Sequence, residues 1–143
     1  MSFIDVFRAA RESRDYARLG EAIPYMQATG ISVQAGADGV VLVLGATVEH
    51  VGNPWRQALH GGFIGALLET AAIVQLVLEQ DSDTLPKPIN VTVDYLRSGR
   101  VMETRASARV TKLGRRVANV HASCWQDDPA RPIATLSGHF LMS

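Results

Sequence analysis

The stretch with the clearest capacity for chemistry is ALHGGFIGALLETAA, residues 58–72. His60, Gly61 and Gly62 precede a run of almost wholly apolar residues, and one carboxylate, Glu69, lies within that run. A carboxylate is costly to bury unless it is paired or hydrogen-bonded. Glu69 is therefore a candidate catalytic group, and an acid that faces solvent or pairs with an arginine is the alternative interpretation.

The two glycines lie where a loop is expected to become a helix. The first amides of a helix have no partner within it and carry partial positive charge, so they suit an anion or a developing oxyanion. Glycine also lets a ligand carbonyl approach the backbone closely. A tight turn into the helix is the simpler explanation of the pair and stays open.

The spacing between the glycines and the acid sets a geometric condition. A helix that starts near Gly61 places Glu69 about two turns later, roughly 11 Å along the axis. The acid would then lie too far from the helix-start amides of its own chain to share a reacting group with them. It could meet those of a second chain if two such helices run antiparallel across a dimer interface.

The remaining polar candidates carry weaker signals. His60 could act as a general base, bind a ligand or fix the loop, and Asn53 could form a turn or hydrogen-bond a substrate. A lone histidine without a second ligand at metal spacing indicates no metal site. Cys124 lies in an alternating run and is expected to be a packed strand thiol. Loop or strand packing is expected for the other histidines, which are His50, His121 and His139.

Length and composition limit the class of protein. With 143 residues, 47% of them apolar, and a formal net charge of zero, the chain is expected to form one domain over residues 1–143 and offers no electrostatic case for nucleic acid or an anionic membrane. It shows no signal peptide and no window of about 18 apolar residues, so we expect no membrane span. The single cysteine fits a reducing, cytoplasmic location. No phosphate loop, dinucleotide fingerprint or serine nucleophile elbow is present.

The first half of the chain predicts helices around one hairpin. Residues 1–28 form a helical segment, with a pattern from about Ile4 to Gln27 that breaks at Pro24 and a cap at Ser2 or Asp5. Two strands, 31–34 and 40–44, flank the turn sequence AGADG. An irregular loop leads into a helix at 61–80 that is apolar around most of its circumference and therefore buried.

The second half alternates with a period of two. Strands are predicted at 89–95, 103–113, 117–126 and 133–142. The resulting order of a helix, two strands, a long helix and four strands indicates an α+β fold, with about six antiparallel strands against one central helix. Such a sheet leaves one edge and one helix face uncovered, so we expect a homodimer or a multiple of one.

Three stretches together are similar to a known family. LHGGFIGALLETAA, VTVDYLRSGR and VTKLGRRVANVHASCW resemble the hotdog-fold acyl-CoA thioesterases, especially the phenylacetic-acid-pathway and 4-hydroxybenzoyl-CoA groups, from about Gly30 to the C-terminus. The resemblance implies a sheet wrapped around the long helix, active sites at the dimer interface, and dimers that often pair into homotetramers. It also implies that Glu69 acts as nucleophile or general base and that the amide of Gly62, or of its neighbour Gly61, polarises the thioester carbonyl.

The implied reaction is hydrolysis of an acyl-CoA thioester to the free acid and CoA, without a cofactor or metal. An aromatic or short- to medium-chain acyl group would lie against Phe63, Leu67 and Tyr95. Cations at the mouth of the site would bind the CoA phosphates, and the candidates are Arg97, Arg100, Lys112, Arg115 and Arg116.

Two departures from the family pattern support an alternative function. The position six residues before the histidine, usually Asn or Gln, is Pro54, while Asn53 lies seven before. The Ser or Thr usual near the start of the following strand is replaced by Pro88, and Asn90 and Thr92 are the candidate substitutes. A non-catalytic hotdog protein that binds acyl-CoA or another apolar ligand is therefore the second hypothesis. A hydratase or dehydratase is the third, and the position of the HGG motif argues against it.

Overall fold

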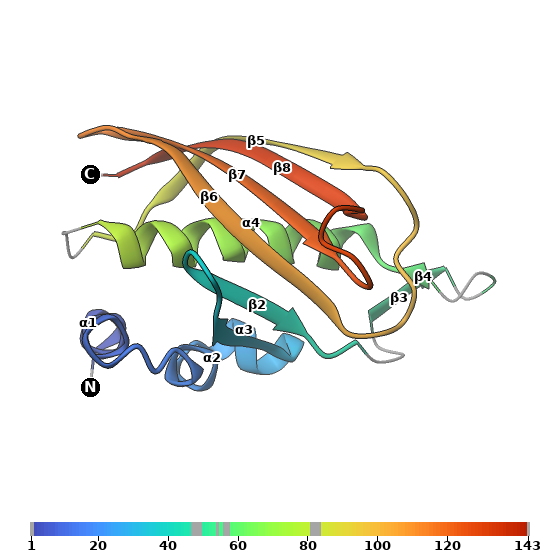
Figure 1. Cartoon of the computed structure of the whole chain (residues 1–143), viewed down its shortest axis with the longest axis horizontal. Helices are drawn as coiled ribbons and strands as arrows, with labels where there is room; N and C mark the ends of the chain where they lie inside the picture. Colours follow the sequence, from blue (N-terminus) through green and yellow to red (C-terminus); the bar gives the residue numbers. More distant parts are fainter. Residues whose placement is uncertain (1, 47–49, 54, 56–57, 81–83, 143) are drawn as a thin grey trace.

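One antiparallel sheet wraps a central helix (Figure 1). The computed structural model describes residues 2–46, 50–53, 55, 58–80 and 84–142. The strand order is β1-β2-β6-β7-β8-β5, which confirms the predicted α+β fold. The elements are β1 (Ile31–Ala35), β2 (Val40–Leu44), α4 (Gly61–Glu79), β5 (Lys87–Tyr95), β6 (Thr104–Leu113), β7 (Val117–Trp125) and β8 (Ala134–Leu141).

The N-terminal segment forms three short helices, α1 (Phe3–Ser13), α2 (Ala17–Ala22) and α3 (Pro24–Thr29). Ser2 caps α1 in a reciprocal arrangement with Asp5, and Pro24 starts α3 at its first position, as predicted. The break after α1 was not predicted. It occurs at Arg14, whose φ of 59° is left-handed, a conformation that a non-glycine residue rarely adopts.

An arginine of α1 ties this segment to the central helix. The Arg11 guanidinium donates to the carbonyls of Val77 at 2.6 Å and Leu78 at 3.2 Å. The last carbonyls of a helix have no partner within it and carry partial negative charge. Arg11 therefore provides hydrogen-bond donors for two carbonyls at the C-terminal end of α4.

The loop before α4 is more ordered than its sequence indicates. It contains a two-stranded sheet of β3 (Val51–Asn53) and β4 (Ala58–Leu59). The His60 amide donates to the His50 carbonyl at 2.7 Å, and the Leu59 amide donates to the Gly99 carbonyl at 2.9 Å. These bonds fix the point at which α4 begins.

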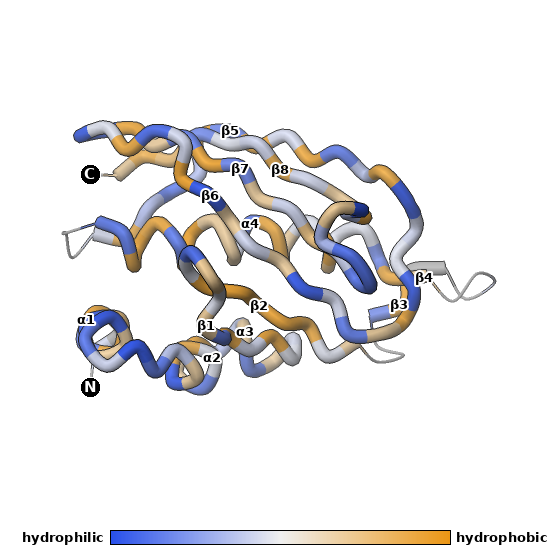
Figure 2. The backbone as a smooth tube through the Cα atoms, in the orientation of Figure 1, coloured by the Kyte–Doolittle hydropathy of each residue, from blue (hydrophilic) through white to orange (hydrophobic). Residues whose placement is uncertain are grey.

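The core lies between α4 and the inner face of the sheet. Figure 2 shows hydrophobic residues concentrated on α4 and β2, and Leu67, Leu68 and Leu76 of α4 are fully buried. With 19 residues and a mean hydropathy of 1.8, α4 is long and apolar enough to cross a membrane. This corrects the expectation that no such window exists, because the average tolerates Glu69 and Gln75. The helix packs here as the core helix of the sheet.

The two edges of the sheet differ in how they are covered. α2 packs so closely on β1 that a methyl group at Gly20 would lie 3.2 Å from the Ile31 carbonyl oxygen. β5, at the other edge, is exposed along nearly all of its length, including Ile89 at 53% and Tyr95 at 56%. An exposed edge of this length is a template for pairing with another chain.

The one cysteine lies inside the sheet. Cys124 of β7 is fully buried, as expected for a strand thiol. Burial raises the pKa of this thiol to about 12. Because the thiolate is the nucleophilic form, Cys124 has a structural role.

Candidate active site

His60 caps the helix that carries the HGG motif. Its Nδ1 accepts a hydrogen bond from the Gly62 amide at 2.8 Å. The amides of Phe63 and Ile64 donate to the His60 carbonyl at 3.0 and 3.2 Å. Within the described residues, the Gly61 amide is thus the one donor of this first turn without a partner. The family resemblance implied Gly62 or its neighbour as the oxyanion donor, and the hydrogen bonding of this turn favours Gly61.

Tyr95, at the end of β5, lies over the start of α4. Its hydroxyl donates to the Gly61 carbonyl at 2.9 Å. A methyl group at Gly65 would lie 3.3 Å from the same hydroxyl oxygen. A cavity of about 350 Å³ opens here, with Gly61, Ile64, Tyr95 and Arg97 among its lining residues. Because Gly61 and Gly65 carry no side chain, the Tyr95 ring has room to lie beside the Gly61 amide.

Glu69 is half-buried on the open side of α4, the side that also carries Gly62, Ala66 and Ile73. It lies eight residues beyond Gly61, about 12 Å along the axis. Among the residues that the structure describes, none hydrogen-bonds to Glu69 or forms an ion pair with it. The predicted separation between the acid and the amides of its own chain is therefore present, and the carboxylate remains available to a ligand or a second chain.

Tyr25 is a neighbour of this acid that the sequence did not reveal. Burial raises the pKa of the Tyr25 phenol above its ordinary value, and the negative charge of Glu69 raises it further. The phenol and the carboxylate are therefore close enough to interact electrostatically. Pro24 marked the start of α3 in the sequence, but no local pattern showed that this helix would lie near Glu69.

His50 connects α3 to the start of α4. Its Nε2–H donates to the Thr29 carbonyl at 2.8 Å, and its ring meets Phe63 edge to face with the centroids 4.7 Å apart. Only 6% of His50 is exposed. The packing role expected for this histidine is confirmed, and the contact places Phe63 beside the HGG turn.

The candidate phosphate-binding cations do not form one cluster within the chain. Arg97 donates to the Pro132 carbonyl at 3.1 Å, and Arg100 forms an ion pair with Asp127. Both arginines line a cavity of about 220 Å³ that shares Arg97 with the cavity at Tyr95. Lys112, Arg115 and Arg116 lie instead at the β6–β7 hairpin, at the opposite end of the sheet (Figure 1).

The remaining predicted residues lie away from the helix start or beyond description. The Asn53 backbone pairs with Ala58 in the β3–β4 sheet, and Pro54 is outside the described residues. Pro88 is exposed on β5. Asn90 Oδ1 bonds the His139 ring at 2.9 Å, on the outer face of the sheet, and Thr92 shares that face. Neither Asn90 nor Thr92 points toward α4. No group of three metal-ligating side chains occurs within the residues described.

Comparison with known proteins identifies the family. The family model for the acyl-CoA thioesterase N-terminal domain matches residues 51–141. A Chromobacterium violaceum protein of known crystal structure is 35% identical, with 96% of each chain covered and a TM-score of 0.77. The chain belongs to the acyl-CoA thioesterase family. No curated protein matches it.

Two more distant structures share the fold of this thioesterase-family chain. A phenylacetic acid degradation-related protein from Ralstonia eutropha is 23% identical, with 95% and 98% of the two chains covered and a TM-score of 0.77. A Bacillus halodurans protein crystallised with CoA is 21% identical, with 99% and 88% covered and a TM-score of 0.76. The sheet that wraps α4 is the hotdog fold that the family resemblance implied.

Proposed function

We propose that this chain hydrolyses acyl-CoA thioesters to the free acid and CoA. The observation that carries the proposal is the start of α4, where His60 occupies the Gly62 amide and leaves the Gly61 amide open. An open amide at a helix N-terminus is suited to a thioester carbonyl and to the oxyanion it becomes. The unpaired Glu69 supplies the acid.

The complete site requires a second copy of the chain. We propose that β5 pairs antiparallel with β5 of a second copy across the exposed edge. Antiparallel pairing sets the Tyr95 end of one strand beside the Lys87 end of the other. It also brings the α4 of the second copy alongside in the opposite direction, so that Glu69 of that copy approaches the Gly61 amide. Pairing of two such dimers into a tetramer, which the family resemblance implies, is part of the proposal.

The same pairing explains why the cations are divided between two ends of the sheet. The β6–β7 hairpin lies at the end where β5 begins, since both Val117 and Lys87 are in register with Leu141. In the paired arrangement this end of the second copy faces the helix start of the first. Arg115 and Arg116 of the second copy would then join Arg97 and Arg100 around the CoA phosphates.

The chemistry follows from these positions. The thioester carbonyl oxygen accepts a hydrogen bond from the Gly61 amide. Glu69 either attacks the carbonyl carbon, with water later releasing the acid, or removes a proton from the water that attacks. The tetrahedral oxyanion is held by the same amide, the carbon–sulfur bond breaks, and the CoA thiolate leaves and takes up a proton. One oxyanion donor contributes about 10²–10³ to the rate of such reactions.

The walls of the site favour a compact acyl group. Tyr95, Ile64 and Phe63 surround the helix start with aromatic and aliphatic surface. This favours an aromatic or short- to medium-chain acyl group over a charged one. The crystal structure of the Bacillus halodurans neighbour with CoA supports a CoA ester as substrate.

We propose a cytoplasmic location for the reaction.

The test is thiol release from short, medium, long and aromatic acyl-CoAs. Wild type is compared with Glu69→Gln and with the control Glu79→Gln, which changes an exposed carboxylate on the same helix. We expect hydrolysis of at least one ester by wild type and Glu79→Gln and its collapse in Glu69→Gln. Undiminished hydrolysis by Glu69→Gln would refute the role of this acid. No hydrolysis of any ester by a folded oligomer would favour the ligand-binding alternative.

A further inference from the structure

The sheet is split on one side of β6. β2 pairs with β6 only from Leu44↔Thr104 to Leu42↔Ala106. Beyond Leu42 the chain leaves toward the turn at residues 36–39, while β6 continues to Leu113. Beyond Ala106, the backbone groups on this side of β6 therefore have no strand partner among the described residues, and they require water or a ligand.

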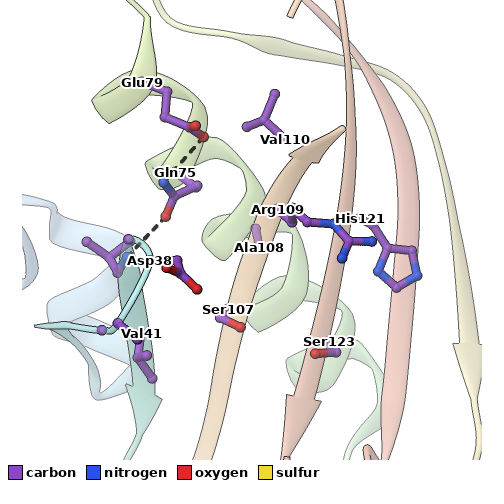
Figure 3. Close-up of a pocket in the computed structure, with 14 residues that line it drawn as sticks. Asp38, Val41, Gln75, Glu79, Ser107, Ala108, Arg109, Val110, His121 and Ser123 are labelled. Carbon is purple, nitrogen blue, oxygen red and sulfur yellow. Dashed lines mark hydrogen bonds between the residues drawn. The ribbon is translucent and has the colours of Figure 1, made fainter. Parts of the chain in front are cut away.

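A cavity of about 530 Å³ occupies the split (Figure 3). The β1–β2 turn and Val41 form one wall, and the unpaired edge of β6 with the outer face of β7 forms the other. Ser107 and Arg109 line the cavity from the outer face of β6, and Ala108 and Val110 line it from the inner face. Gln75 and Glu79 of α4 line its inner end. This volume is within the range of small-molecule sites.

The cavity walls are held in place by Gln75. This side chain is buried, its Oε1 accepts from the Val40 amide at 3.1 Å, and its Nε2 donates to Glu79 at 3.3 Å. Gly39, at φ 156°, has no room for a side chain because a Cβ would lie 2.5 Å from Gln75 Oε1. The hydrogen bond from Val40 to Gln75 therefore holds the turn against α4, and the cavity is formed without a ligand.

The chemistry of the two walls is complementary to one class of molecule. Ser107 lies opposite Ser123, and Arg109 opposite His121, so the four side chains share one face. Figure 3 shows the Arg109 guanidinium beside the His121 ring. None of the four side chains has a hydrogen-bond or ion-pair partner within the described residues. A guanidinium with two hydroxyls suits a phosphate group.

The opposite wall carries acceptors in place of donors. The Asp38 carboxylate extends from the turn toward β6 (Figure 3), and Glu79 lies at the inner end of the cavity. Carboxylates accept hydrogen bonds from the hydroxyl groups of a ligand, as acidic residues do with ribose.

We propose that this cavity binds a phosphorylated, hydroxyl-rich small molecule, such as a sugar phosphate. The phosphate lies against Arg109, Ser107 and Ser123, and the hydroxyls face Asp38 and Glu79. Gln75 is 14 residues beyond Gly61 on α4, about 21 Å along the axis. Gln75 is also six residues beyond Glu69, about 9 Å along the axis, and faces about 120° away from it around the helix. No residue assigned to the proposed active site lines this cavity. The proposed binding site is therefore separate from the proposed active site and does not depend on the proposed hydrolysis.

The test is a titration of the full-length ¹⁵N-labelled protein, followed by amide chemical shifts. Ribose 5-phosphate, inorganic phosphate and ribose are compared as probes. We expect ribose 5-phosphate to shift the amides of Val40, Ser107 and Ser123 and to bind more tightly than inorganic phosphate, with ribose weakest. Arg109→Ala should weaken the binding of ribose 5-phosphate about tenfold or more.

Arg105→Ala is the matched control, because Arg105 lies on the same face of β6, pairs with Glu103 at 3.3 Å and does not line the cavity. It should bind ribose 5-phosphate as wild type does. Ser123→Leu, which fills the cavity from an outward-facing position, should abolish binding. Absence of shifts in wild type, equal losses in the two arginine variants, or equal binding of ribose and ribose 5-phosphate would each overturn the proposal. Hydrolysis of acyl-CoA by Arg109→Ala, measured in parallel, should match wild type.

Discussion

Replacing Gly61 with proline tests the oxyanion donor without disturbing the helix. Proline has no backbone N–H, so this substitution removes the candidate oxyanion donor. Proline is also favoured at the first position of a helix, because the N–H of that position has no partner within the helix. Gly61 occupies this position, after the capping residue His60. The His60 ψ of 130° already lies in the extended range that a residue before proline prefers.

The structure also sets the expected magnitude. Within the described residues the Gly61 amide has no bond to lose, and the Gly61 carbonyl, which accepts from Tyr95, is retained in proline. Folding stability should therefore change by no more than about 1 kcal/mol. Loss of one oxyanion donor should lower kcat by about 10²–10³, equivalent to roughly 3–4 kcal/mol of transition-state stabilisation.

Gly61→Ala is the matched control because it keeps the N–H. Its Cβ would lie 3.5 Å from the Tyr95 ring, an ordinary contact. The assay is thiol release at saturating acyl-CoA for wild type and both variants, with circular dichroism and thermal melting to establish that they fold alike. Equal activity of folded Gly61→Pro and Gly61→Ala would refute the assignment of this amide.

Three further predictions concern the core, the turn and the edge strand. Burial raises the pKa of Cys124 from 9.0 to about 12, so the thiol stays protonated below that pH. At pH 8 only about one molecule in 10⁴ carries the thiolate. Iodoacetamide should therefore modify the protein only after denaturation. Gly39→Ala should lower the free energy of unfolding by about 2–4 kcal/mol in urea titrations, because its Cβ displaces the buried Gln75 amide. Val91→Lys, on the exposed edge of β5, should convert the proposed dimer to monomer in sedimentation experiments, whereas Gln34→Lys, exposed on β1 at the opposite edge of the sheet, should not.

Each of these has a result that would contradict it. Alkylation of Cys124 in the native protein at the rate of a free thiol would contradict its burial. Gly45→Ala, whose Cβ would meet nothing closer than 3.9 Å, is the control for Gly39→Ala, and similar destabilisation by both would exclude the Gln75 clash as the cause. An unchanged sedimentation coefficient for Val91→Lys would place the interface elsewhere.

Most of the fold follows from local sequence signals. Period-two alternation located β5 to β8, and the turn sequence AGADG located the β1–β2 hairpin. The Ser2 cap and the Pro24 start were visible because they act within one helical turn. The break at Arg14 was missed because arginine carries no left-handed preference, and β3 and β4 were missed because two- and three-residue strands have no periodicity to detect.

The candidate site was predictable as a set of residue types and not as a set of contacts. Glu69 and the HGG motif were evident from their unusual neighbours. The hydrogen bond from the Gly62 amide to His60 Nδ1 depends on the side-chain rotamer of His60. The approach of Tyr25 to Glu69 depends on how α3 packs. The separation of the arginines into two groups follows from the length of the β6–β7 hairpin. These are tertiary facts, and no spacing within the sequence specifies them.

The most direct test of the account is complementation between two inactive chains. Glu69→Gln and Gly61→Pro, carrying different purification tags, are co-expressed and the mixed oligomer is isolated for thiol-release assays. If the amide of one chain works with the acid of the other, each mixed dimer contains one intact site, and about half of the wild-type activity should return. If both groups act within one chain, every site in the mixed dimer carries a defect, and the mixed oligomer would be as inactive as its parents.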